Sequence, residues 1–393
     1  MTRAALAVLL ALPAAAQAVE FKPKLEAEVR CFYDAEDADG DTPVLGSIAG
    51  TLEVYAGFDD GRQRLVGEFF ARWDENDGER THGDVRELYY QVSGESFEFR
   101  AGARRVFWGV TESRHLVDII NQSDFVENIS NEQKLGQPML SLAGIFEAGT
   151  VEAFLMPLHR ERTFPGMDGW PRLPLPVQDG AVYTSDDEEH NLDYALRYSG
   201  SFGPVDVGIA WFDGTGREPR LELGVGPPGL VLVPTYDAWR QASIDAQWVT
   251  GSMAWKLEAV NRDTAGERTW GSVAGFEYTF GDVAGSGIDI GVLGEYLADE
   301  KDEALNALVD DEVFAGLRLA LNDVAGTTLL AGVLASSDDG KSRRYGVEAS
   351  GRLNDNWKLS GEARIFSQFP DNDPLLAFLA EQSFVTITLE RYF

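Results

Sequence analysis

The sequence predicts an all-β fold, a transmembrane antiparallel β-barrel of about eighteen strands. Three observations support this prediction. Segments of about ten residues alternate apolar and polar side chains along most of the chain. The connections between these segments alternate between tight turns and long acidic loops, as in barrels whose two ends differ in loop length. The chain also begins with a stretch typical of exported proteins.

Residues 1–18 predict a secretory signal peptide. A positive charge at Arg3 precedes a short apolar core, and the Ala-Gln-Ala sequence at 16–18 fits a cleavage site. The core is too short for a membrane-spanning helix, which requires about 18 apolar residues, and it lacks the polar face of an amphipathic helix. We therefore expect the mature chain to begin near Val19 and to form one domain over 19–393.

The chain is strongly acidic, with a formal net charge of −32. That charge argues against a nucleic-acid partner, because phosphates would be repelled. The acidic residues gather in short runs at 34–41, 74–79, 184–189, 298–303 and 309–312. Asp37, Asp39 and Asp41 loosely resemble a calcium-binding turn, but the spacing of an EF-hand is absent, so we expect solvated charge and no metal. Cys31 is the only cysteine and fits a small apolar side chain on a strand.

The strands show one apolar and one polar face. Trp357, Leu359 and Ala363, for example, interleave with Lys358 and Glu362. A soluble sandwich shares this pattern, but charges on nearly every polar face favour a wet interior, and hence a barrel. The expected strands begin near residues 21, 46, 62, 84, 96, 138, 150, 190, 204, 238, 252, 268, 287, 312, 326, 343, 357 and 383. Sixteen strands would follow if weaker ones are misread; either number encloses an aqueous channel.

The connection after the fifth strand, residues 105–137, breaks the alternation. Its apolar residues recur at helical spacing and predict a short helix that packs on the inner wall: Val110, Leu116, Val117, Ile119 and Ile120. Ser123-Asp124 followed by Glu127 predicts a cap for a second turn. The polar residues expected to face the water path as a constriction are Glu112, Arg114, His115, Asp118 and Asp124. The alternative is a helix that lies over the mouth or covers a weak wall.

A motif in the same region resembles one in a loosely defined group of porin-like outer-membrane proteins. Its matching residues are Arg100, Gly102, Arg105, Val106, Trp108, Gly109, Asp118, Ile120, Asn121 and Asp124. Members of the group often have Pro and Gln where this chain has Gln122 and Arg105. The resemblance implies a porin-like barrel, a homotrimer or a monomer, whose third external loop folds inward and narrows the pore. It names no substrate.

Strand alternation places basic residues in the lumen, namely Arg100, Arg104, Arg318, Arg344, Arg352 and Arg364. The last four come from strands near one another, and the porin resemblance implies that such a wall, facing acidic residues, creates a transverse field. The alternative is that the charges simply pair with one another. The overall acid excess predicts a weak preference for cations.

Two loops and the C-terminus complete the pattern. Prolines in 158–189 and 214–236 predict irregular loops, the first folding over the mouth as a lid.

The last strand places apolar residues on one face and ends on Phe393, although Arg391 interrupts the series. This ending resembles the signal by which barrels are recognised for insertion. It implies the barrel-assembly machinery, outer-membrane lipid and lipopolysaccharide as partners.

No enzymatic pattern emerges. The histidines, His82, His115, His159 and His190, lie in no H-E-x-x-H or His/Cys metal pattern, and no G-x-S-x-G occurs. We therefore expect no catalytic residues, no metal and no cofactor. The sequence predicts a channel for passive diffusion of small hydrophilic solutes across the outer membrane of a Gram-negative bacterium. The alternative is a non-conducting barrel that serves as a surface scaffold or binding protein.

Overall fold

The computed structural model describes residues 18–33, 43–129, 132–227, 229–264, 266–300, 311–337, 342–367, 378 and 381–393. The expected signal peptide lies outside these ranges except for Ala18, as does the acidic run 34–41 with its calcium-like turn. Within the described ranges, no helix has the length and apolar character that a membrane-crossing helix requires.

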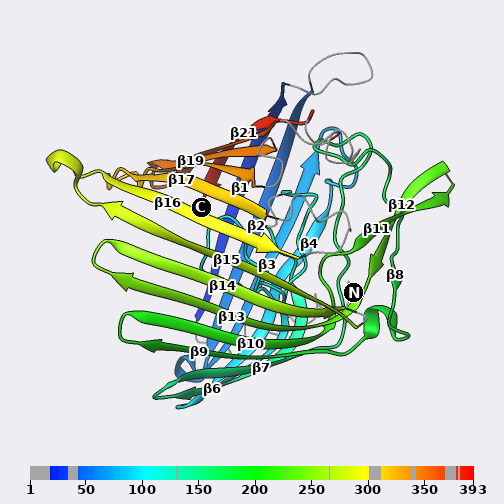
Figure 1. Ribbon diagram of the computed structural model, residues 1–393, viewed down its shortest axis with the longest axis horizontal. Helices are drawn as coiled ribbons and strands as arrows, with labels where there is room; N and C mark the ends of the chain where they lie inside the picture. The colour runs from blue at the N-terminus through cyan, green and yellow to red at the C-terminus, as the bar shows by residue number, and fades with distance from the viewer. Residues whose placement is uncertain are drawn as a thin grey trace.

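Eighteen antiparallel strands form a closed ring (Figure 1). They are β1 (Ala18–Phe32), β2 (Val44–Phe58), β3 (Gln63–Asp74), β4 (Gly83–Ser93), β5 (Phe97–Arg104), β6 (Gln137–Phe146), β7 (Gly149–Met156), β9 (Asp193–Phe202), β10 (Val205–Thr215), β13 (Ala238–Thr250), β14 (Met253–Thr264), β15 (Glu267–Phe280), β16 (Asp289–Asp299), β17 (Asp311–Ala320), β18 (Thr328–Ser336), β19 (Arg343–Asn354), β20 (Trp357–Ser367) and β21 (Phe384–Tyr392). Each strand pairs with the next, and β21 pairs with β1 from Lys24 opposite Tyr392 to Phe32 opposite Phe384. The ring therefore has no free edge, and the predicted fold class is confirmed.

The two faces of the wall differ as expected. Outward side chains such as Phe21, Val29 and Ile387 are about half exposed, whereas Glu28 and Arg30 of β1 are buried inside. The apolar face that looks away from the lumen is the one that a lipid environment requires. Arg391, which interrupts this face on β21, lies over the rings of Trp357 and Phe393 at 5.0 and 4.8 Å. These cation–π contacts accommodate the charge next to aromatic side chains.

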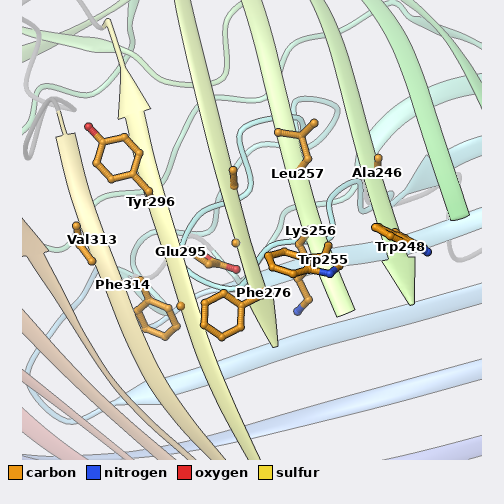
Figure 2. Close-up of a pocket in the computed structure, with 13 residues that line it drawn as sticks. Ala246, Trp248, Trp255, Lys256, Leu257, Phe276, Glu295, Tyr296, Val313 and Phe314 are labelled. Carbon is orange, nitrogen blue, oxygen red and sulfur yellow. The ribbon is translucent and has the colours of Figure 1, made fainter. Parts of the chain in front are cut away.

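Aromatic residues gather on the outer face of β13–β17 near the tight turns. Figure 2 shows Trp248, Trp255 and Phe276 on neighbouring strands there; Trp248 lies opposite Trp255 in the strand register, and the rings of Trp255 and Phe276 are 5.9 Å apart. Small residues such as Ala274 and Gly294 leave an open groove of about 580 Å³ between the rings. Aromatic side chains at the ends of spanning strands are typical of barrels at a membrane interface.

The loop 214–236 was expected to be irregular, and this expectation was wrong. It contains the hairpin of β11 (Arg220–Gly226) and β12 (Gly229–Tyr236), and β8 (Val182–Tyr183) pairs in parallel with β12. This small sheet lies beside the mouth, outside the ring of barrel strands (Figure 1). Apolar alternation before the turn and an apolar run after it outweigh the prolines: Pro227 lies at the turn, and the β11–β12 ladder accommodates Pro234 opposite Leu221.

The longer loop between β7 and β9 crosses the mouth, as a lid would. Trp170 packs on the rings of β1 and β21, with its ring centroid 5.8 Å from that of Phe32. Asp77 in the β3–β4 connection is buried and accepts hydrogen bonds from the backbone N–H of Gly166 at 3.1–3.2 Å. The loops at this end of the barrel therefore hold one another in place.

Candidate functional site

The third loop, residues 105–136 between β5 and β6, crosses the lumen. It leaves the wall after Arg104, and the Glu112 carboxylate reaches the Arg318 guanidinium of β17 at 2.6 Å. In the order of the ring, β5 is the fifth strand and β17 the fourteenth of eighteen, so the two walls are half a ring apart. The loop therefore passes from one side of the barrel to the other.

The apolar residues of the third loop pack on the inner wall, as the sequence predicts. Val117 and Ile120 have no exposed surface. They belong to a core cluster with Trp108 of the loop, Phe154 of β7 and Phe212 of β10. The interior of this part of the barrel is therefore a dry core, unlike the charged lumen beside it.

The predicted helix is absent: residues 105–129 and 132–136 contain turns and an isolated bridge but no helix. The physical reason lies in the partners of the backbone. Glu258 of β14 accepts hydrogen bonds from the N–H groups of Val110, Thr111 and Val117 at 2.8, 3.1 and 3.3 Å. It also accepts one from the Thr111 hydroxyl at 2.7 Å. Wall carboxylates thus replace the carbonyls of a helix as acceptors.

A second wall carboxylate holds the tip of the loop. Glu295 of β16 accepts hydrogen bonds from the N–H groups of Glu112 and Ser113 at 2.7 and 2.8 Å, and from the Ser113 hydroxyl at 2.6 Å. Both carboxylates are at least nine-tenths buried. A buried carboxylate that receives several donors is fully satisfied, and each bond is stronger than one between neutral groups. Residues 110–117 are therefore fixed to the wall by two charged acceptors.

The second half of the loop is tied to the opposite wall. The Glu127 carboxylate accepts from Arg72 of β3 at 2.9 Å, and the Glu127 carbonyl accepts from Arg30 of β1 at 3.4 Å. Asp124 has no exposed surface and accepts from the Thr163 hydroxyl at 2.8 Å. Of the five predicted constriction residues, Asp124 therefore joins this buried network and does not face the water path.

The other four predicted constriction residues line one cavity. Glu112 lies between Arg318 and the more distant Lys256. Asp118 accepts a hydrogen bond from the backbone N–H of Trp108 at 3.2 Å and forms an ion pair with Lys134 at 3.1 Å. Burial alone would lower the pKa of His115, but the Glu258 carboxylate 3.7 Å away raises it above its ordinary value. Arg114 is the fourth of these predicted residues that line the cavity.

This cavity, of about 200 Å³, lies at the end of the barrel that carries the long loops. Its walls come from the third loop, from the first residues of β13 and the last of β14, and from the loops after β7 and β10. The lining residues are Phe107, Glu112, Ser113, Arg114, His115, Leu116, Asp118, Ile119, Asn121, Ser123, Glu132, Lys134, Arg162, Arg217, Glu218, Trp239, Gln241 and Arg262. We call it the mouth cavity.

The basic residues predicted in the lumen are largely paired with carboxylates. Arg104 binds Glu152 at 2.8 Å, and Arg318 binds Glu277 at 3.1 Å as well as Glu112. The remaining pairs are Arg100 with Glu98 and Glu152, Arg344 with Glu312, and Arg364 with Glu348 and Glu362. Arg352 is exposed near the turn end of β19. The structure thus favours paired charges over a free basic wall facing an acidic one.

Sequence reasoning missed the residues that position the loop. Alternation places Glu258 and Glu295 in the lumen, but a carboxylate on a lumen face gives no sign that a loop will dock on it. Arg162, Arg217 and Arg262 of the mouth cavity were missed because two of them lie in loops far from the third loop in sequence. Among the described residues, no group of three His, Cys, Asp or Glu side chains is placed to hold a metal ion.

Comparisons with known proteins identify the fold of this chain and no family. No protein-family model matches the chain, and no curated protein matches it. A BenF-like porin from Pseudomonas fluorescens Pf-5 superposes with a TM-score of 0.56 at 10% identity, over 96% of this chain and 98% of that chain. A mutant of a Rh. blastica porin gives a TM-score of 0.45 at 11% identity, over 96% of this chain and 100% of that chain.

The chain has a porin fold. A porin-fold barrel with an apolar outer face fits a bacterial outer-membrane protein. The likeness is one of fold alone, so the motif resemblance over 100–124 stays a sequence prediction.

Proposed function

We propose that the protein is a porin-like channel through which small hydrophilic solutes diffuse passively across a bacterial outer membrane. The observation that supports this best is a closed ring of eighteen strands whose inner face carries charges and whose third loop spans the lumen. Barrels of this size enclose more space than wall side chains fill. The third loop then sets the width of the path.

In this proposal the charged residues at the third loop set the selectivity. Glu112, Arg114, His115 and Asp118 line the mouth cavity, and solutes would pass them before reaching the paired charges of the wall. Charges in a narrow path with low-dielectric walls focus the electric field and favour some solutes over others. We also propose that 1–18 is removed as a signal peptide and that Phe393 belongs to a signal for the barrel-assembly machinery.

One observation favours a second candidate, a closed barrel that serves as a scaffold or surface binding protein. The third loop is tied to opposite walls, by Glu112 to Arg318 and by Glu127 to Arg72, and the loop bearing Trp170 lies over the mouth. Such ties narrow the lumen from both sides. The two candidates differ in whether ions cross the barrel.

Conductance of the purified mature protein in a planar bilayer distinguishes them. A channel shows discrete openings, and deletion of residues 110–124 raises the conductance of each opening. Deletion of 222–229, the tip of the β11–β12 hairpin outside the ring, is the matched control and leaves conductance unchanged. If wild-type protein and the 110–124 deletion are both silent, although both run as folded, heat-modifiable barrels on gels, the scaffold function replaces the channel.

The assembly state and partners follow from the same proposal. We propose a trimer or a monomer embedded in outer-membrane lipid and lipopolysaccharide, without nucleic acid. Cross-linking of the protein in native outer membranes, followed by denaturing and non-denaturing gels, distinguishes the two states.

A further inference from the structure

The mouth cavity differs in charge from the rest of the chain. The chain has 33 basic and 65 acidic residues. The cavity lining, in contrast, has five Arg or Lys side chains and four carboxylates, with His115 in addition. The basic lining residues are Arg114, Lys134, Arg162, Arg217 and Arg262, and the acidic ones are Glu112, Asp118, Glu132 and Glu218. A local excess of basic groups in so acidic a protein points to a specific role.

Two of the arginines are fixed in position, Arg217 in the loop after β10 and Arg262 near the end of β14. Arg217 and Arg262 are more than nine-tenths buried. Buried carboxylates behind the lining bind them: Asp193 at 2.7 Å from Arg217 and Asp299 at 2.8 Å from Arg262. These pairs offset much of the charge, but they also fix the direction in which the guanidinium groups point. Each planar guanidinium keeps further N–H groups for another acceptor.

Two N–H groups around the cavity have no oxygen acceptor within the described part of the chain, and a third donor has no carboxylate partner there. The Trp239 indole N–H is buried and unpaired. The Nη2 group of Arg217 has only the sulfur of Met156, a weak acceptor, at 3.5 Å. Arg162 reaches the Gln122 amide oxygen at 3.3 Å and a backbone carbonyl at 3.5 Å, and no described carboxylate lies within ion-pair distance of it. Buried donors without an acceptor are costly, so the N–H groups of Trp239 and Arg217 suit a ligand that brings acceptors.

The carboxylates of the lining are, by comparison, already engaged. Glu112 binds Arg318 from outside the cavity, and Asp118 binds Lys134 and a backbone N–H. Glu132 lies 3.9 Å from Arg364, another group outside the lining. Three of the four lining carboxylates therefore already lie near a cation, whereas Arg162 has no carboxylate partner among the described residues. This imbalance favours an anion over a cation.

The cavity is also in the right place to receive solutes. Trp239 and Gln241 of β13 and Arg262 of β14 lie at the end of the barrel that carries the long loops, beside the residues of the third loop that Glu258 and Glu295 hold. Leu116 and Ile119 form an apolar part of the lining. A solute that enters from the long-loop end therefore reaches this cavity where it meets the third loop.

We propose that the mouth cavity binds small solutes that carry an oxyanion group, such as a carboxylate or a phosphate ester, and that Arg162 and Trp239 are two of its donors. This inference rests on the proposed channel function for its place in transport, but binding itself does not depend on conduction. Oxyanions accept several hydrogen bonds at once and pair with guanidinium groups in a planar, two-pronged geometry.

Calorimetric titration of the full mature protein in detergent tests the site directly. The probes are four solutes of similar size: gluconate, glucose 6-phosphate, glucose and glucosamine. Gluconate and glucose 6-phosphate are expected to bind, and glucose and glucosamine to bind far less. Arg162→Gln is expected to weaken gluconate binding roughly tenfold and Trp239→Phe roughly fivefold, the ranges for one charged and one neutral hydrogen bond. Arg268→Gln, the same change at an exposed position, is the control and leaves binding unchanged.

Tighter binding of glucosamine than of gluconate would overturn the proposal and would support the cation preference that the overall charge predicts. Equal losses in Arg162→Gln and Arg268→Gln would overturn it as well, because a general charge effect would then explain both. Swelling of liposomes in the same four solutes tests the channel separately. Anion binding without swelling keeps the site and removes the channel, whereas swelling without anion binding keeps the channel and removes the site.

Discussion

Neutralising Glu295 is expected to release the tip of the third loop from the barrel wall. This carboxylate accepts three hydrogen bonds, from the N–H groups of Glu112 and Ser113 and from the Ser113 hydroxyl, at 2.6–2.8 Å. The change Glu295→Gln keeps the shape of the side chain. It replaces one acceptor oxygen by an NH₂ group, which faces donors and cannot accept from them.

The magnitude follows from these contacts. A hydrogen bond to a charged acceptor contributes about 1.5–3 kcal/mol, and a buried donor left without a partner costs about 1–3 kcal/mol. Glu295→Gln loses at least one such bond, although Ser113 keeps a partial alternative because its hydroxyl rotates. We expect the docked state of the loop to lose about 2–4 kcal/mol, which corresponds to roughly a 30-fold to 700-fold shift toward the undocked state.

Hydrogen exchange of the protein in detergent measures this shift, because the amide groups of residues 110–117 are protected only while docked. Exchange in this segment is expected to accelerate in proportion, while exchange in the barrel strands stays as in the wild type. The control is Glu348→Gln, another wall carboxylate, which binds Arg364 and not the loop. Unchanged exchange in Glu295→Gln, or equal acceleration in Glu348→Gln, would refute the docking role of Glu295.

Three further outcomes are expected. Burial by itself would lower the pKa of His82, but its interaction with Asp124 outweighs this effect, so the pKa lies above its ordinary value. The pair therefore stabilises the docked loop below the ordinary pKa of 6.5, and this contribution disappears as the pH rises through the raised pKa. Exchange near Asp124, corrected for intrinsic rates, should accelerate as the pH rises above 6.5. His82→Asn should abolish that dependence. Asp77→Asn weakens the bonds from Gly166, and limited proteolysis should cut the loop after β7 several-fold faster. Phe393→Ala should lower the amount of heat-modifiable barrel in outer membranes without changing total synthesis; equal amounts would contradict the insertion role.

The barrel itself was predictable because its physical constraint acts on every strand. Lipid on one side and water on the other impose alternation along each strand, and this pattern has the period of the backbone itself. All eighteen expected starts lie within three residues of the observed ones; the largest differences are at β1, expected at 21 and beginning at Ala18, and at β9, expected at 190 and beginning at Asp193.

The third loop was predictable only in part. Its apolar residues belong in a core wherever the loop lies, so the packing of Val117 and Ile120 followed from composition. Its backbone conformation could not be predicted in this way, because Glu258 and Glu295 lie more than a hundred residues away in sequence. No local sequence pattern indicates that they bind the loop. Asp124 illustrates the same limit: a polar residue of a lumen loop faces water or a buried partner, and only the fold decides which.

The hairpin at 220–236 carried a signal that prolines obscured. Leu221, Leu223 and Val225 alternate before a turn rich in proline and glycine, and an apolar run follows it. Proline excludes pairing only where its missing N–H is needed, so a proline at a turn is compatible with strands on both sides. A search for apolar segments of strand length on each side of the turn would have found the pair.

The bonds of Glu112 to Arg318 and of Glu127 to Arg72 make the third loop a brace between opposite sides of the barrel. A tube whose wall is one strand thick flattens readily when pressed from the side, because bending the wall breaks no hydrogen bonds between strands. A loop that is bound to opposite sides of the wall resists such flattening. The cross-section of the barrel then depends in part on the bonds that fix the loop to opposite walls, and loss of the Arg318 or Arg72 guanidinium would make the wall easier to deform.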